Sequence, residues 1–158
     1  MAMRGFSTLT KAEDLLRKLE REYARLQADP TDVDCAWNFF VTAEHLPDWL
    51  SEGKDRLPTG EKLGDFKRDN QLIRICSHLA NGGKHFAPWP SYKSVSAIEH
   101  DGVVDPDVYE PDIFEEWMSV HLTPHEAAAF GQTTIDVRQL AAQVLAFWQQ
   151  QLRGTAAP

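Results

Sequence analysis

Apolar residues recur at helical spacing in the first part of the chain. Thr10 and Glu13 have the spacing of a capping box, in which a hydroxyl and a carboxylate satisfy free N–H groups at a helix start. Pro30 cannot continue a helix, so it marks the end of this one. The apolar positions between them are Ala12, Leu15, Leu16, Leu19, Tyr23 and Leu26. This pattern predicts an amphipathic first helix.

A second helix is predicted from about Val33 to Leu50, because Asp32 suits a helix start and a broad apolar face follows it. Pro47 lies inside this stretch, and its ring removes an N–H donor and crowds the preceding turn. We therefore expect a kink or a restart around Leu46. Since the turn between the first two helices is short, they should form a hairpin.

Two further helices are predicted, from about Leu63 to Asn81 and from about Val137 to Leu152. The pair Gly82-Gly83 follows the earlier one, and glycine readily adopts the positive φ that ends a helix. Lys84 and His85 would then follow a C-cap, near carbonyl groups that favour cations.

The pattern changes over residues 86–122, where prolines and β-branched residues replace the helical period. Asp101-Gly102 is a turn dipeptide, and we expect an irregular acidic insertion with short strands, in which Phe114 to Leu122 is an edge strand. Thr123 and Glu126 have the spacing of a cap for a short helix. The elements together predict a mainly α fold, a four-helix bundle with a loop and short-strand insertion between helices three and four, in one domain over residues 1–158.

Composition places the chain among single-domain globular proteins, with 158 residues and 42% hydrophobic content. It has neither the ~20 apolar residues of a membrane span nor the apolar segment of a signal peptide, so we expect a cytoplasmic protein without membrane association. Cys35 and Cys76 lie on apolar helix faces and suggest buried thiols rather than a disulfide. The net charge of −8 disfavours extended DNA binding, because phosphate neutralisation supplies most of that affinity.

Two polar stripes repeat at positions i, i+4, i+7 and i+11, which keeps their members on one side of a helix. If the stripes face each other, their histidines, amide groups and guanidinium meet in one cleft. A solvated amphipathic surface explains the same pattern equally well. The stripes are Asn38, Thr42, His45 and Trp49, and Arg74, His78, Asn81 and His85.

Metal and cofactor sites are not predicted. The sequence has no Glu-x-x-His or Cys-x-x-Cys pair to align ligands, and no glycine-rich phosphate loop. Metal-independent RNA cleavage is the more specific enzymatic alternative, since it needs only a proton-transferring histidine and a cation near the phosphate. His85 and His78 would transfer protons, and Arg74 and Lys84 would stabilise the charge.

Two of these helices also carry motifs that resemble a known family. The second contains Thr-Ala-Glu-His-Leu-Pro-Asp-Trp, and Ala-Asn-Gly-Gly-Lys-His spans the end of the third. These are similar to Thr-Ala-x-His-Leu-x-Asp-Trp and Ala-Asn-x-x-Lys-His in short helical proteins of bacteria and phages that have no established activity. The resemblance implies that certain positions are functional, but it does not say what they do. These positions are His45, Asp48, Asn81, Lys84 and His85.

Members of that family carry an acid where this chain has His78. A more distant likeness is to the HEPN group of helical nucleases, whose active site is an arginine, four to six residues and a histidine. Three residues separate Arg74 from His78 and ten separate it from His85, so the HEPN pattern is not met.

The leading hypothesis is a non-enzymatic cytoplasmic module for interaction or ligand binding, with a metal-independent ribonuclease as the alternative. We expect its partner to be a protein or a small ligand, with a homodimer as a further option. The expected binding residues are those to which the resemblance points, His45, Asp48, Asn81, Lys84 and His85.

Overall fold

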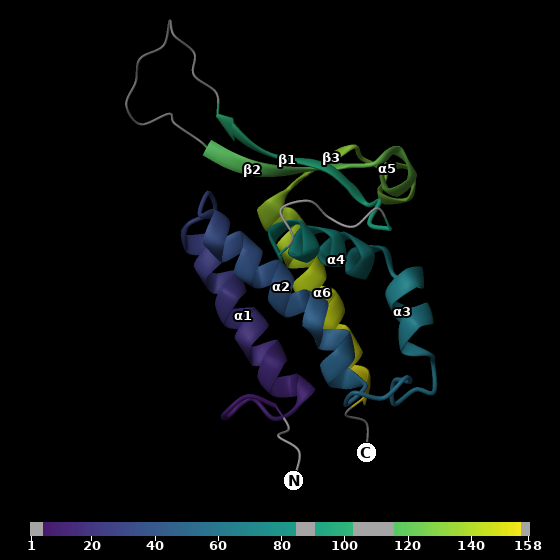
Figure 1. The fold of residues 1–158 in the computed structure, drawn as a ribbon. Coiled ribbons are helices and arrows are strands. Elements are labelled where there is room, and N and C mark those ends of the chain that lie inside the picture. The colour runs from purple at the N-terminus through teal and green to yellow at the C-terminus, as the bar shows by residue number, and fades with distance from the viewer. Residues whose placement is uncertain (1–4, 85–90, 103–115, 156–158) are drawn as a thin grey trace, which may run out of the picture.

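The computed structural model describes residues 5–84, 91–102 and 116–155, and every structural statement below refers to these. Within them the chain is mainly helical with a small sheet, as the sequence predicted (Figure 1). The helices are α1 Ala12–Ala28, α2 Val33–Leu50, α3 Leu63–Asp69, α4 Gln71–Lys84, α5 Pro124–Phe130 and α6 Val137–Thr155. The strands are β1 Val95–Gly102, β2 Glu116–Leu122 and β3 Thr134–Asp136.

The start of α1 is capped by Asp14 rather than by the predicted Glu13. Its Oδ2 accepts the backbone N–H groups of Thr10 and Lys11 at 3.0 and 3.2 Å. The carboxylate therefore satisfies two donors that a helix start leaves without an intrahelical partner. The predicted range of this helix is confirmed, while the capping residue was wrong by one position.

Helix α2 begins and ends where the sequence predicted. Asp32 caps it by accepting the N–H groups of Asp34 and Cys35 at 2.8 and 3.1 Å. The helix continues through Pro47, which is buried, so of the two expected alternatives around Leu46 the restart was wrong, while the kink stays a prediction.

The predicted third helix is two helices, because the chain is extended at Asn70, with φ −94° and ψ 113°. The Asn70 side chain donates to the Phe66 carbonyl at 2.8 Å and competes with the helical hydrogen-bond pattern. Beyond this break α4 runs through Gly82 to Lys84. Gly82 does not adopt a positive φ, so the prediction that the glycine pair ends the helix and places Lys84 after a C-cap was wrong.

The three strands form an antiparallel sheet in the order β1-β2-β3. β2 is therefore the central strand and not the predicted edge strand, and the short β3 was not predicted. In the β1–β2 register Ile98 lies opposite Val120 and His100 opposite Met118. Asp101-Gly102 belongs to the end of β1, and residues 103–115 lie outside the described part of the chain.

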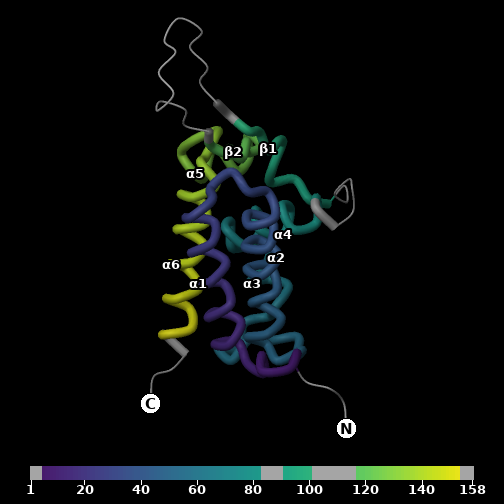
Figure 2. Tube along the Cα trace, turned by 90° about the vertical axis from the view of Figure 1, so that its left-hand side faces the viewer, coloured from purple at the N-terminus to yellow at the C-terminus, as the bar shows by residue number. Residues whose placement is uncertain are grey.

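The sheet lies across one end of the helices (Figure 1). Viewed from the side, β1 lies over α4 (Figure 2), and the two are in contact. One hydrophobic cluster joins the helices to the inner face of β2, where Met118, Val120 and Leu122 are buried. Because burial of apolar area is the main favourable term in folding, this shared cluster holds the sheet on the helices.

Candidate functional site

The predicted site residues of α2 make their contacts with different partners. Both carboxylate oxygens of Asp48 lie 2.9 Å from Nζ of Lys67, which joins the end of α2 to α3. His45 Nδ1 lies 3.3 Å from Oε2 of its neighbour Glu44. These contacts join His45 neither to Asp48 nor to Asn81.

The predicted residues at the end of α4 are described in part. Asn81 donates from Nδ2 to the Ser77 carbonyl of its own helix at 2.7 Å. Lys84 is the last residue of α4, and its side chain, like all of His85, lies outside the described residues. Whether His45 and His85 are neighbours therefore stays a prediction, as do the binding roles of all five predicted residues.

A buried carboxylate that the sequence did not reveal organises the other polar stripe. Glu126 on α5 is 1% exposed. Arg74 of α4 donates to it from Nε at 2.8 Å and from the Nη2 nitrogen at 2.9 Å. Gln71 donates to Oε2 at 2.9 Å and Ser94 to Oε1 at 2.9 Å. Since every donor comes from another element, Glu126 joins α5 to α4 and to the start of β1.

The charge on Glu126 is maintained by these hydrogen bonds. Burial by itself raises the pKa of a carboxyl group, but the bonds from Arg74, Gln71 and Ser94 outweigh it and hold the pKa of Glu126 below its ordinary value. The expected capping role of Glu126 at the start of α5 was wrong, because its side chain serves this network instead. The Thr123 hydroxyl likewise donates to the Lys93 carbonyl at 2.6 Å.

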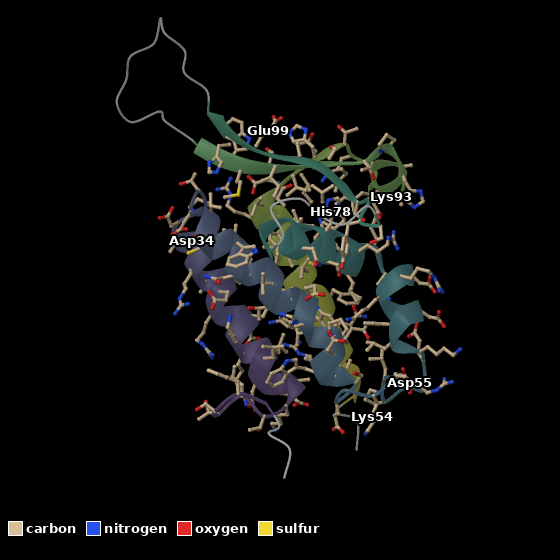
Figure 3. All side chains as sticks on the ribbon, in the orientation of Figure 1. Asp34, Lys54, Asp55, His78, Lys93 and Glu99 are labelled. Atoms are coloured by element: carbon tan, nitrogen blue, oxygen red, sulfur yellow. The ribbon has the colours of Figure 1, made fainter. Side chains whose placement is uncertain are left out.

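His78 is buried between α4 and the sheet (Figure 3). Its Nδ1 accepts the backbone N–H groups of Ser94 and Val95, each at 3.0 Å. A nitrogen that accepts two such bonds carries no proton, and burial lowers the pKa of His78 from its ordinary value. His78 is therefore a neutral anchor for the start of β1.

This arrangement predicts that stability falls in mild acid. The pKa of His78 in the folded chain lies below the ordinary 6.5. As pH drops below about 6.5, His78 therefore becomes protonated in the unfolded chain before it does so in the folded chain. We expect the free energy of unfolding to fall by at most about 1.4 kcal/mol per pH unit through this group. Urea unfolding between pH 7.5 and 5.5 measures the slope.

The matched control for this measurement is the exposed His125 on α5. We expect the slope to flatten in His78→Gln and to stay unchanged in His125→Gln. Glu126 acts with the same sign but at lower pH, because its pKa is depressed below the ordinary 4.5. An equal slope in both variants would contradict the assignment of the pH dependence to His78.

A separate feature is an apolar groove of about 440 Å³ between the start of α2, the end of α4 and the inner face of the β1–β2 hairpin. This size is in the range of ligand pockets. Its ionisable lining residues are Asp34 and His100. The apolar lining residues are Val33, Ala36, Trp37, Phe40, Leu79, Ile98, Met118, Val120 and Val137.

The rim of this groove is apolar as well. Val33, Trp37 and Ile98 are 56%, 39% and 52% exposed, although large apolar side chains are normally buried. Phe6 is the other exposed large hydrophobic residue among those described, and it does not line the groove. Contiguous exposed apolar surface marks interaction sites, so the groove is the best candidate functional site.

The described residues contain no group of three metal-ligating side chains and no helix long and apolar enough to cross a membrane. No protein-family model, curated protein or solved structure matches this chain. The groove combines concave shape, apolar walls and one carboxylate, which suits it to bind apolar groups.

Proposed function

We propose that this protein is a non-enzymatic cytoplasmic binding module, and that its groove receives apolar side chains of a partner protein. In this proposal α1, α2, α4 and α6 form the four-helix bundle that the sequence predicted, and the bundle supports the groove. The observation that carries the proposal is the concentration of exposed Val33, Trp37 and Ile98 around one cavity. Exposed tryptophan is typical of binding surfaces, because it buries a large area with few rotatable bonds.

The ribonuclease hypothesis stays a prediction, and none of the described contacts supports it. Arg74 is held by Glu126, and Nδ1 of His78 is occupied by two backbone donors. A general base needs a free nitrogen within reach of the proton it removes. The other proposed proton-transfer residue, His85, lies outside the described residues.

Binding of Nile red, an uncharged apolar dye, tests the groove directly. We expect a saturable fluorescence increase with the wild-type protein and about tenfold weaker binding by Trp37→Ala, since tryptophan is among the residues that contribute most to binding sites. Phe6→Ala is the matched control, because it also removes an exposed aromatic ring but lies outside the groove. Equal loss of Nile red affinity in both variants, or no saturable binding by the wild-type protein, would contradict the proposal.

A further inference from the structure

Among the described strands, β1 has a neighbour on one edge only. The order β1-β2-β3 places β2 against one side of β1, and no other described strand pairs with the opposite side. A free edge presents unpaired backbone N–H and C=O groups, which can pair with another extended chain. The bulge between Val95 and Ala97 interrupts the ladder, so the regular part of this edge begins at Ala97.

The free edge lies beside the groove. Ile98 and His100 of β1 pair with Val120 and Met118 of β2, and all four side chains line the groove. They therefore share the inner face of the sheet. On that face the β2 side chains Val120 and Met118 are buried, whereas Ile98 of β1 is exposed to solvent.

A strand added beside β1 would complete this inner face. Every second side chain of the added strand would point the same way as Ile98, because side chains alternate along a strand. Those side chains would cover the exposed Val33 and Trp37 of α2, which line the same groove. An extended segment with apolar residues at alternate positions fits both the backbone edge and the apolar walls.

The charge of the surface around the groove indicates which charge a partner segment would carry. Asp34 lines the groove, and no lysine or arginine is among its described lining residues. Figure 3 shows Asp34 at the start of α2. With a net charge of −8, the protein attracts a cationic segment and repels a second copy of itself.

We propose that the free edge of β1 accepts an extended basic peptide segment of a partner protein by strand addition, with alternate apolar side chains inserted into the groove. This inference rests on the proposed function and names its partner. Backbone pairing with β1 supplies the register, and the groove selects the apolar positions. Asp34 favours lysine or arginine near the inserted stretch.

Fluorescence anisotropy with a defined peptide tests the proposal. The probe is a fluorescein-labelled, end-blocked peptide of about eight residues, Lys-Val-Thr-Val-Thr-Val-Thr-Lys, which matches the usual length of a strand. We expect saturable binding that Trp37→Ala weakens about tenfold and Phe6→Ala leaves unchanged. A version with glutamate in place of both lysines should bind about fivefold more weakly, and Asp34→Asn should reduce that difference.

Backbone methylation distinguishes strand addition from simple apolar contact. One peptide carries N-methyl groups on every valine and another on every threonine, so each blocks a different edge of the extended chain. We expect one of them to bind more than about tenfold more weakly and the other to bind like the parent, because several ladder hydrogen bonds are lost on one edge only. Equal binding of the two methylated peptides would overturn strand addition.

The remaining outcomes separate this inference from the proposed function. If Trp37→Ala weakens Nile red binding but the peptide does not bind, strand addition is wrong and the groove remains a binding site. If neither probe responds to Trp37→Ala, both proposals are wrong. A sedimentation coefficient that rises with protein concentration, and no longer does so in Ile98→Ser, would overturn the peptide partner in favour of a second copy.

Discussion

Glu126→Ala is expected to lower the free energy of unfolding by about 3–5 kcal/mol, because it removes one partner of a buried ion pair. The carboxylate is 1% exposed and accepts hydrogen bonds from Arg74, Gln71 and Ser94. Without it, the buried Ser94 and the partly exposed Arg74 and Gln71 lose their shared acceptor. An unsatisfied buried group costs more than the bond itself contributes.

Urea unfolding followed by circular dichroism measures this change, and a double-mutant cycle with Arg74→Met isolates the pair. We expect a coupling energy of about 2 kcal/mol or more, since each single change leaves the other charge without its partner. Lys54→Ala is the control, because its exposed ion pair with Glu52 lies in the loop after α2. A loss below about 1 kcal/mol in Glu126→Ala would show that water replaces the network at little cost.

Trp148→Ala is expected to be equally destabilising, with a loss of about 3–5 kcal/mol. Trp148 on α6 is 1% exposed, and its ring centroid lies 6.1 Å from that of Phe66 on α3 and 5.2 Å from that of Phe147. Truncation would leave a cavity where α3 packs against α6. The surrounding helices can relax only partly into such a space, so most of the lost contact energy is not recovered.

Trp37→Ala is the matched control for this experiment. The side chain is the same, but Trp37 lies on the rim of the groove and is partly exposed. We expect its unfolding free energy to change by about 1 kcal/mol or less while its binding of Nile red weakens about tenfold. The reverse pattern, with a stable Trp148→Ala and an unfolded Trp37→Ala, would contradict the division between core and binding surface.

The helices could be predicted from the sequence because their signals are local. Apolar residues in α1 and α6 repeat at helical spacing, and Asp32 is a strong cap for α2. The helix predictions were wrong at residues for which the local rule allows more than one backbone conformation. Pro47 continues α2, and Gly82 lies within α4 because glycine permits a positive φ without requiring it.

The candidate site was less predictable. The polar stripes did contain residues with defined tertiary partners, since Arg74 bonds to Glu126 of α5 and His78 bonds to the start of β1. The sequence places Trp37 on the broad apolar side of its helix, but periodicity does not distinguish a covered position from an open one. The signal that could have drawn attention to the groove was the width of that face, which exceeds what a helix hairpin buries.

The amino-acid sequence by itself determined where α1, α2 and α6 form, and it determined the acidic charge, because periodicity, capping and composition are properties of neighbouring residues. Only the tertiary structure decided that Glu126 pairs with Arg74 across 52 positions and that Ile98 of β1 meets Trp37 of α2 around one groove. Such contacts depend on how the sheet packs across the helix ends. That packing follows from the burial of the whole core, for which no short stretch of sequence carries a signal.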